Sequence, residues 1–223
     1  MHAVVPASER VPSSVRRRSW FVAGVVAAAC GGKLVADPPV TLRDIGAGEL
    51  RAVAEFDGIR DPAARSRALF SEASRVLLHP RCVNCHPAGD VPHQGDALAL
   101  HDPPVIRGDA NHGVAGMECE GCHQDRNQAL TRVPGAPGWH LAPREMAWVG
   151  KTAAELCAQL KDPARNGGKT LAQIAEHSAH DELVAWGWAP GADRQPAPGN
   201  QQQFGALIAA WAETGAACPE DRR

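Results

Sequence analysis

The sequence predicts a mainly α-helical, loop-rich protein with a single folded domain. Four segments begin with a helix-capping residue and continue with apolar residues at helical spacing, near residues 61, 152, 170 and 200. Gly and Pro number 22 and 18 among the 223 residues. Aromatic residues make up only 4% of the chain and Tyr is absent, so the chain has little aromatic core of its own. The length suits one medium-sized domain, and much of it is expected to be loop.

Residues 1–29 are expected to be an export signal of the bacterial lipoprotein type. Three arginines at positions 16–18 precede a ten-residue apolar run, which is too short to span a bilayer. Cys30 directly follows three alanines, which resembles a lipoprotein processing site where Cys30 would carry the lipid. Cleavage after Ala29 by an ordinary signal peptidase is the alternative. Either route places the mature chain in the periplasm, with a membrane anchor if Cys30 is lipidated.

Residues 30–60 are polar and weakly patterned, and they are expected to form a tether or linker, or to wrap over the surface. The domain that follows is expected to span residues 61–219. Its first helix should have Asp61 as the cap and Pro62 at the first helical position. The expected apolar stripe consists of Leu69, Ala73, Val76 and Leu77, before Pro80 ends the helix.

The five-residue pattern C-x-x-C-H occurs twice, at residues 82–86 and 119–123. In this pattern two thiols reach the vinyl groups of one porphyrin and the following histidine binds the iron, so it is the attachment signature of a c-type haem. The sequence therefore predicts two covalent haems, on Cys82 and Cys85 and on Cys119 and Cys122. His86 and His123 would be the proximal iron ligands. A zinc site or a redox-active dithiol is the alternative.

Both haems are expected to lie in one domain of the cytochrome c-like kind. Only 33 residues separate Cys85 from Cys119, too few to complete a separate domain around the first haem. Residues 87–116 and 124–150 are rich in Gly and Pro with almost no periodicity, so they are expected to be loops that cover haem.

Three more helices are expected in the last third of the chain. Thr152 and Glu155 form a capping box for the first of them, and Thr170 caps the second. Asn200 caps the third, which should end at Gly215. The expected apolar positions are Leu156, Leu160, Leu171, Ile174, Ala175, Phe204, Leu207, Ile208 and Trp211.

Seven cysteines are present, and two have no role in the motifs or in lipidation. These are Cys157 and Cys218. In an oxidising compartment they are expected to form a disulfide that ties a middle helix to the C-terminal end. Two free buried thiols are the alternative.

Three residues are the leading candidates for the sixth iron ligands. Met146 is the only Met beyond the second motif, in an irregular segment, although it could instead fill a gap in the core. His101 lies in the loop between the motifs, where a solvent-facing histidine is the alternative. His177 follows Ile174 by one helical turn, so it is expected on the apolar face, as a ligand or a core histidine. His112, His140, His180 and Met117 are weaker candidates.

Several stretches resemble small two-haem bacterial cytochromes commonly labelled as a subunit of isoquinoline 1-oxidoreductase. They lie at residues 82–90, 94–96, 107–108, 119–123, 140–143, 161–167, 186–188 and 215–219. The resemblance implies a partner of the molybdenum hydroxylase type. The chain has no further cysteine set for iron–sulfur clusters, so it would be the electron-carrying subunit and not the catalyst.

The expected function is periplasmic electron transfer from such a dehydrogenase to the respiratory chain. Residues 30–223 carry 19 basic and 24 acidic residues, which argues against nucleic acid and for docking onto a basic protein patch. One His/Met haem and one bis-His haem would differ in potential and form a relay. A small dihaem peroxidase-like enzyme with one open iron site is one alternative, and a four-cysteine structural zinc module is another.

Overall fold

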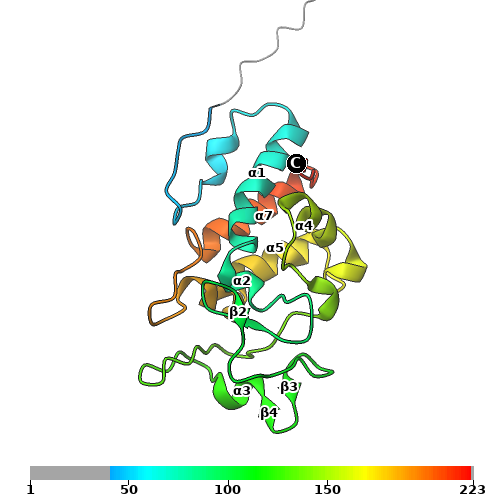
Figure 1. The fold of residues 1–223 in the computed structure, drawn as a ribbon. Helices are drawn as coiled ribbons and strands as arrows, with labels where there is room; N and C mark the ends of the chain where they lie inside the picture. The colour runs from blue at the N-terminus through cyan, green and yellow to red at the C-terminus, as the bar shows by residue number, and fades with distance from the viewer. Residues whose placement is uncertain (1–40, 222–223) are drawn as a thin grey trace, which may run out of the picture. The chain divides into compact units, whose positions relative to one another are not determined.

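Helix α7 (Gln201–Glu213) lies at the centre of the helical part and is flanked by α1 (Pro62–Leu77) and α5 (Leu171–His180). The computed structural model describes residues 41–221, and these belong to one compact unit. The helices α1, α4 (Ala153–Leu160), α5 and α7 gather toward one end, and a loop-rich part forms the opposite end (Figure 1). The mainly helical, loop-rich class predicted from the sequence is confirmed.

The four expected helices begin at the expected caps. The Asp61 side chain accepts from the Ala64 backbone N–H at 2.6 Å and caps α1. Thr152 and Thr170 open α4 and α5 in capping boxes, and Asn200 caps α7. Capping satisfies the N–H groups that the first helical turn leaves unpaired.

The core is formed by the apolar faces of α1, α4, α5 and α7. Their fully or almost fully buried members include Leu69, Phe70, Ala73, Val76, Leu156, Leu160, Ile174, Leu207, Ile208 and Trp211. Gly205 allows close approach of α5 and α7, because a Cβ there would lie 2.5 Å from the Cβ of Ala179. The stripes predicted for α1 and α7 are therefore the faces that build the core.

The loop-rich end contains only short elements. Strands β1 (His93–Gln94) and β2 (Ala99–Leu100) form one antiparallel pair, and β3 (Gly113–Val114) and β4 (Met117–Glu118) form another. The remaining elements are η1 (Val53–Phe56), α2 (Pro80–Val83), α3 (Cys119–Cys122), η2 (Arg144–Met146), η3 (Pro163–Arg165), α6 (Glu182–Ala185) and η4 (Trp186–Trp188), where η marks a 3₁₀ turn. The expected loops at residues 87–116 and 124–150 are thus irregular apart from these hairpins and single turns.

The segment before α1 packs on the domain as far as the structure describes it. Leu50 and Phe56 belong to the hydrophobic core, with exposed fractions of 3% and 1%. Glu72 of α1 is buried and pairs with Arg51 at 2.6 Å and with Arg75 at 2.9 Å. Residues 41–60 are therefore a surface wrap held by apolar contacts and ion pairs, and they extend the domain beyond the boundary expected at residue 61.

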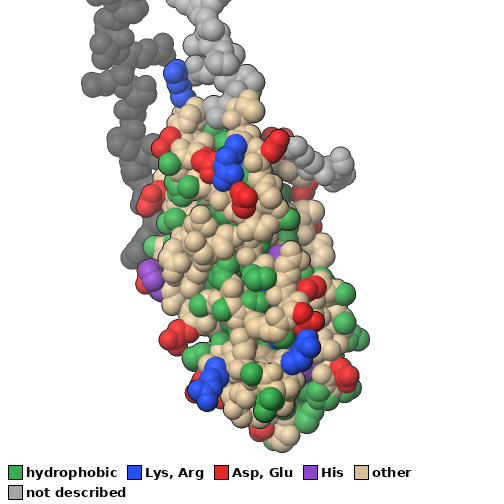
Figure 2. Space-filling view, turned by 90° about the vertical axis from the view of Figure 1, so that its left-hand side faces the viewer, with side chains coloured by type: hydrophobic (Ala, Val, Ile, Leu, Met, Phe, Trp, Pro, Cys, Tyr) green, Lys and Arg blue, Asp and Glu red, His purple; other side chains and the backbone are tan. Residues whose placement is uncertain are grey.

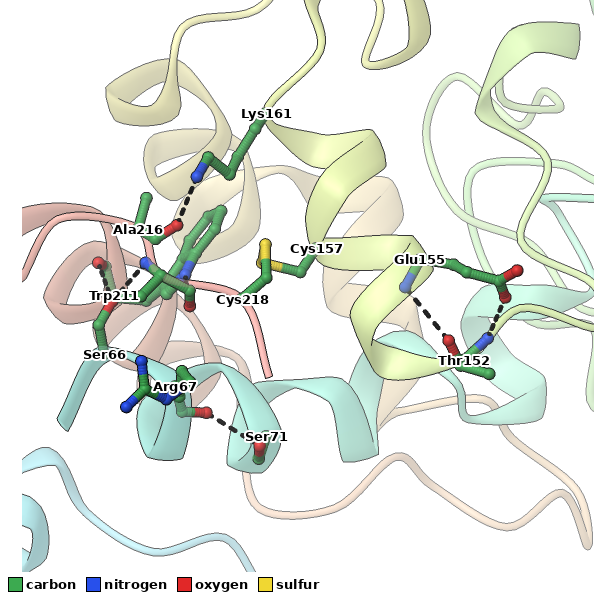
Figure 3. The surroundings of a disulfide bond; sticks show 11 residues. Ser66, Arg67, Ser71, Thr152, Glu155, Cys157, Lys161, Trp211, Ala216 and Cys218 are labelled. Atoms are coloured by element: carbon green, nitrogen blue, oxygen red, sulfur yellow. Dashed lines mark hydrogen bonds between the residues drawn. A yellow bond between two sulfur atoms is a disulfide. The ribbon is translucent and has the colours of Figure 1, made fainter. Parts of the chain in front are cut away.

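The expected disulfide between Cys157 and Cys218 is formed, with the two Cα atoms 5.5 Å apart. It ties α4 to the segment after α7 (Figure 3). Beside it, Lys161 Nζ donates to the Ala216 carbonyl at 2.8 Å, and Trp211 Nε1 donates to the Ala217 carbonyl at 3.1 Å. The C-terminal segment is therefore held by covalent and hydrogen bonds together.

The surface of the described part mixes both signs of charge. On the face drawn in Figure 2, acidic and basic side chains alternate with scattered hydrophobic ones. None of the helices within residues 41–221 combines the length and apolar character needed to cross a membrane. The expected export signal and Cys30 lie outside the described residues.

Candidate functional site

A cavity of about 780 Å³ lies in the loop-rich part, lined by residues of α2, β1, β2, β4 and α3 and of the loops between them. Both C-x-x-C-H motifs reach it, the second through Cys119, Cys122 and His123 and the first through Cys85. The four motif thiols are free in the structure. The fold thus brings together two motifs that are separated by a long loop in the sequence.

The first motif begins in the short helix α2 and is packed against the core. Pro80 is at the first position of α2, and His79 caps the helix by accepting from the Arg81 backbone N–H at 3.2 Å. Cys82 packs against the main hydrophobic core. Burial raises the pKa of Cys82 to about 12 and that of Cys85 to about 11. Both thiols therefore keep their protons at neutral pH.

The His86 imidazole is held on two sides. Its Nδ1 lies 2.8 Å from the Met146 carbonyl oxygen, and its ring stacks on Trp148 with centroids 3.4 Å apart and an interplanar angle of 12°. Burial lowers the pKa of His86 to about 3, so the ring is neutral. Because a carbonyl oxygen only accepts, Nδ1 carries the single proton and Nε2 keeps a free lone pair.

The His123 imidazole has the same surroundings, built from different segments. Its Nδ1 lies 2.7 Å from the Pro134 carbonyl oxygen, and its ring stacks on Trp139 with centroids 4.4 Å apart and an interplanar angle of 5°. Burial lowers the pKa of His123 as well. Trp186 meets Trp139 edge-on at 4.9 Å and completes the wall. Both motif histidines are therefore neutral, with Nε2 free.

Of the three candidates for the sixth ligand, the structure brings His101 to the second motif. The His101 and His123 ring centroids are 5.7 Å apart, and both side chains line the cavity. His101 Nδ1 lies 2.9 Å from the Pro103 carbonyl oxygen, which leaves Nε2 of this ring free too. A metal–imidazole bond of about 2 Å puts two opposite rings on one metal roughly 6 Å apart between centroids. The observed separation is close to that value.

Met146 lies next to His86 through its backbone. Its carbonyl oxygen lies 2.8 Å from Nδ1 of His86, the nitrogen that carries the proton and not the one with the free lone pair. The Met146 sulfur points toward Gly167, where a Cβ would lie 3.4 Å from it. The side chain is partly buried and packs against the core.

The expectation that His177 lies on the buried face of α5 is wrong. Its side chain is 43% exposed, and its Nδ1 lies 3.2 Å from a carboxylate oxygen of Asp181. The buried positions of α5 are Ile174 and Ser178, which face α7. A charge on His177 lowers the pKa of His86, so the two rings are within electrostatic range of each other.

Of the weaker candidates, His140 and Met117 line the cavity, and His112 and His180 do not. His112 stacks on His140 with centroids 5.0 Å apart, and His180 is exposed and pairs with Glu176 at 3.0 Å. Met117 is exposed in β4. Within residues 41–221, no three His, Cys, Asp or Glu side chains gather closely enough to hold a metal ion by themselves.

No protein family, curated protein or solved structure matches this chain. Its site is interpreted from its own residues. Sequence reasoning missed the two Nδ1 acceptors, the carbonyls of Met146 and Pro134, because any residue provides a carbonyl. It also missed Arg81, a buried cation on the cavity wall. The only local signal for Arg81 is its place directly before the first motif.

Proposed function

We propose that this chain is a dihaem c-type cytochrome that carries electrons between redox proteins in the periplasm. One haem would be bonded to Cys82 and Cys85, and the other to Cys119 and Cys122. The proposal rests on one observation above all. His86 and His123 share an environment made of a carbonyl acceptor at Nδ1, an aromatic ring against the imidazole face, and a free Nε2.

This environment suits an axial haem ligand. Histidines that bind metals usually donate their other N–H to a carbonyl or carboxylate, which fixes the tautomer and the ring orientation. The stacked tryptophans hold each ring in place and exclude water from the iron's surroundings. A haem bound there supplies a one-electron redox centre, and the protein orients, ligates and shields it.

The cavity beside the second motif fits a haem in size and in the character of its wall. Its volume of about 780 Å³ falls within the range of cofactor sites. Cys119 and Cys122 border it at α3, and the His101 and His123 rings line it with centroids 5.7 Å apart. We assign His101 as the sixth ligand of this iron. Two histidine ligands make electron transfer the favoured role, because an enzyme would keep one iron position open.

The zinc alternative has less support in the arrangement of the cysteines, because the four motif cysteines do not form a preassembled cluster within the described residues. A dithiol redox site would need a thiol of lowered pKa, whereas burial raises the pKa of Cys82 and Cys85.

The partners and location follow from the sequence and remain part of the proposal. A molybdenum-hydroxylase-type dehydrogenase would donate electrons, and the respiratory chain would accept them. The excess of acidic residues after position 29 suits docking onto a basic patch of a protein. Lipid on Cys30 would keep the protein at the membrane surface.

The first test is haem content. The full chain is produced together with a c-haem maturation system, and intact mass and the pyridine haemochrome spectrum are measured. Two covalent haems per chain are expected. The double variant Cys119→Ala/Cys122→Ala should retain one haem, as should Cys82→Ala/Cys85→Ala. A colourless wild-type protein of unmodified mass that contains zinc would refute the proposal.

Carbon monoxide separates electron transfer from the peroxidase-like alternative. An iron with two protein ligands reacts slowly with carbon monoxide when reduced, whereas an open iron reacts quickly. We expect the second haem of the wild-type protein to react slowly. Fast binding at that haem would favour an enzyme.

A further inference from the structure

The cavity wall contains a guanidinium that is almost completely removed from water. The side chain of Arg81, in α2, is only 1% exposed and lines the cavity. It forms an ion pair with Asp96, and its guanidinium carbon lies 5.8 Å from the centroid of the Trp186 ring. Its Nε is buried without a hydrogen-bond partner in the structure.

Asp96 alone is a weak counter-charge for this group. The Asp96 side chain is 48% exposed, so water screens its attraction for Arg81. Burial lowers the pKa of Arg81, which shows that removal from water disfavours its charge. A buried guanidinium is normally retained with partners for its N–H groups. Because Arg81 lines the cavity, its unpartnered Nε leaves a donor that an anion bound there could use.

A second guanidinium lines the same cavity. Arg194 donates to the carbonyl oxygens of Pro190 and Arg132, and no carboxylate within residues 41–221 forms an ion pair with it. Burial lowers its pKa, and the charge of Arg81 lowers it further, so the two cations lie within electrostatic range of each other. The charges of Asp193 and Asp96, which are both on exposed side chains, oppose these effects in part. Two cations on one cavity wall would both gain from a further anion bound between them.

We propose that Arg81 and Arg194 hold the propionate carboxylates of the haem that occupies this cavity. The inference rests on the proposed function. Thioether bonds to Cys119 and Cys122 place one edge of that haem at α3, and the opposite edge carries the propionates. Arg81 and Arg194 line the same cavity from segments other than α3. Arginine binds carboxylates through paired N–H donors, and such bonds are strongest away from water.

The arginines then set the potential of the second haem. Ferric haem carries one more positive charge than ferrous haem, and nearby cations that neutralise the propionates favour the reduced form. Without a guanidinium, the propionate charge stabilises the ferric state. The potential of that haem should therefore fall when either arginine is made neutral.

The test compares Arg81→Gln and Arg194→Gln with wild-type protein, in the full chain with both haems attached. Each variant should change the reduction equilibrium of one haem about tenfold, which corresponds to about 59 mV. The affected haem should be the one whose spectrum changes in His101→Met. Resonance Raman spectra should also show a shifted propionate bending band. Arg81→Lys keeps the positive charge, so the reduction potential of the affected haem should stay close to that of wild type.

Arg65→Gln is the matched control. Arg65 also pairs with a partly exposed carboxylate, that of Asp57, and also has a buried Nε without a partner, but it does not line the cavity. It should leave both potentials unchanged. If Arg81→Gln folds poorly or does not acquire its haems, Arg194→Gln decides the question. Within the described part of the chain, Arg194 donates hydrogen bonds only to backbone oxygens of loops, so its loss should disturb the fold less.

The outcomes separate this inference from the proposed function. Two haems per chain with unchanged potentials in Arg194→Gln would overturn the inference and leave the cytochrome intact. A change confined to the first haem would overturn it too. A wild-type chain without haem would overturn both.

Discussion

The imidazoles of His101 and His123 meet edge-on at the cavity, with centroids 5.7 Å apart and rings inclined at 68°. The two residues come from different loops, and each ring is oriented by a carbonyl oxygen at Nδ1. Each ring therefore keeps an unprotonated Nε2. This relationship is the reason that two histidine ligands are proposed for the second haem.

We predict that His101→Ala opens the second iron. The reduced variant should bind carbon monoxide quickly, because the position that His101 occupied is then vacant. In His101→Met, the potential of the same haem should rise, since methionine ligation favours the reduced state relative to a second histidine. The measurements are flash-photolysis rebinding and redox titration.

His180→Ala serves as the control for these variants. His180 is exposed, pairs with Glu176 on the same helix, and does not line the cavity. It should leave carbon monoxide binding and both potentials as in wild type. Unchanged behaviour of His101→Ala would show that another residue completes the second iron.

Met146→Leu should leave both potentials and both haem spectra unchanged. The structure uses the backbone carbonyl of Met146 and not its sulfur, and the substitution conserves the carbonyl and the approximate volume. The cost in unfolding free energy should stay below about 1.5 kcal/mol, as for similar volume-conserving changes. A large fall in the potential of the first haem would instead identify the thioether as its ligand.

The sequence predicted best those features that depend on residues close together in the chain. The caps at Asp61, Thr152, Thr170 and Asn200 begin helices as predicted, because a capping hydrogen bond spans only three residues. The disulfide was predictable by elimination, since the motifs and Cys30 accounted for the other five cysteines.

The residues that form the cavity wall could not be predicted from the sequence, for physical reasons. Pro134 and Met146 act through carbonyls, and the chain path that brings these carbonyls to His123 and His86 has no periodic signal. The sequence wrongly predicted that His177 is buried, because two residues, His177 and Ser178, both lie about one helical turn after Ile174. The close contact of Ala179 with Gly205 turns Ser178 inward and leaves His177 outside.

We predict that removal of the disulfide weakens the fold but not the haem sites. The double variant Cys157→Ala/Cys218→Ala avoids a free thiol, and its unfolding free energy should fall by about 2–4 kcal/mol. The bond lies between α4 and the C-terminal segment, and neither cysteine lines the cavity. Urea denaturation followed by circular dichroism measures the loss. Haem content and potentials should match wild type, and altered potentials would show that the helical part controls the haem environment.

Asp181 should make the stability of the fold depend on acid pH. Its pKa is lowered to about 2, chiefly by the hydrogen bond from His177 and also by the N–H group of Val184, against an opposing effect of burial. A carboxyl with a pKa lower in the folded than in the unfolded chain stabilises the fold above its unfolded pKa, about 3.9. That contribution is lost as the pH falls from about 4 toward 2.

Asp181→Asn should therefore unfold more easily than wild type at pH 7, and the difference should shrink toward pH 2. The effect should be modest, because the Asp181 side chain is 36% exposed and water screens its interaction with His177. Urea denaturation at a series of pH values measures it. Glu176→Gln is the matched control, since Glu176 pairs with His180 in the same helix but is 73% exposed. A difference between Asp181→Asn and wild type that is constant from pH 7 to pH 2 would show that the charge of Asp181 does not stabilise the fold.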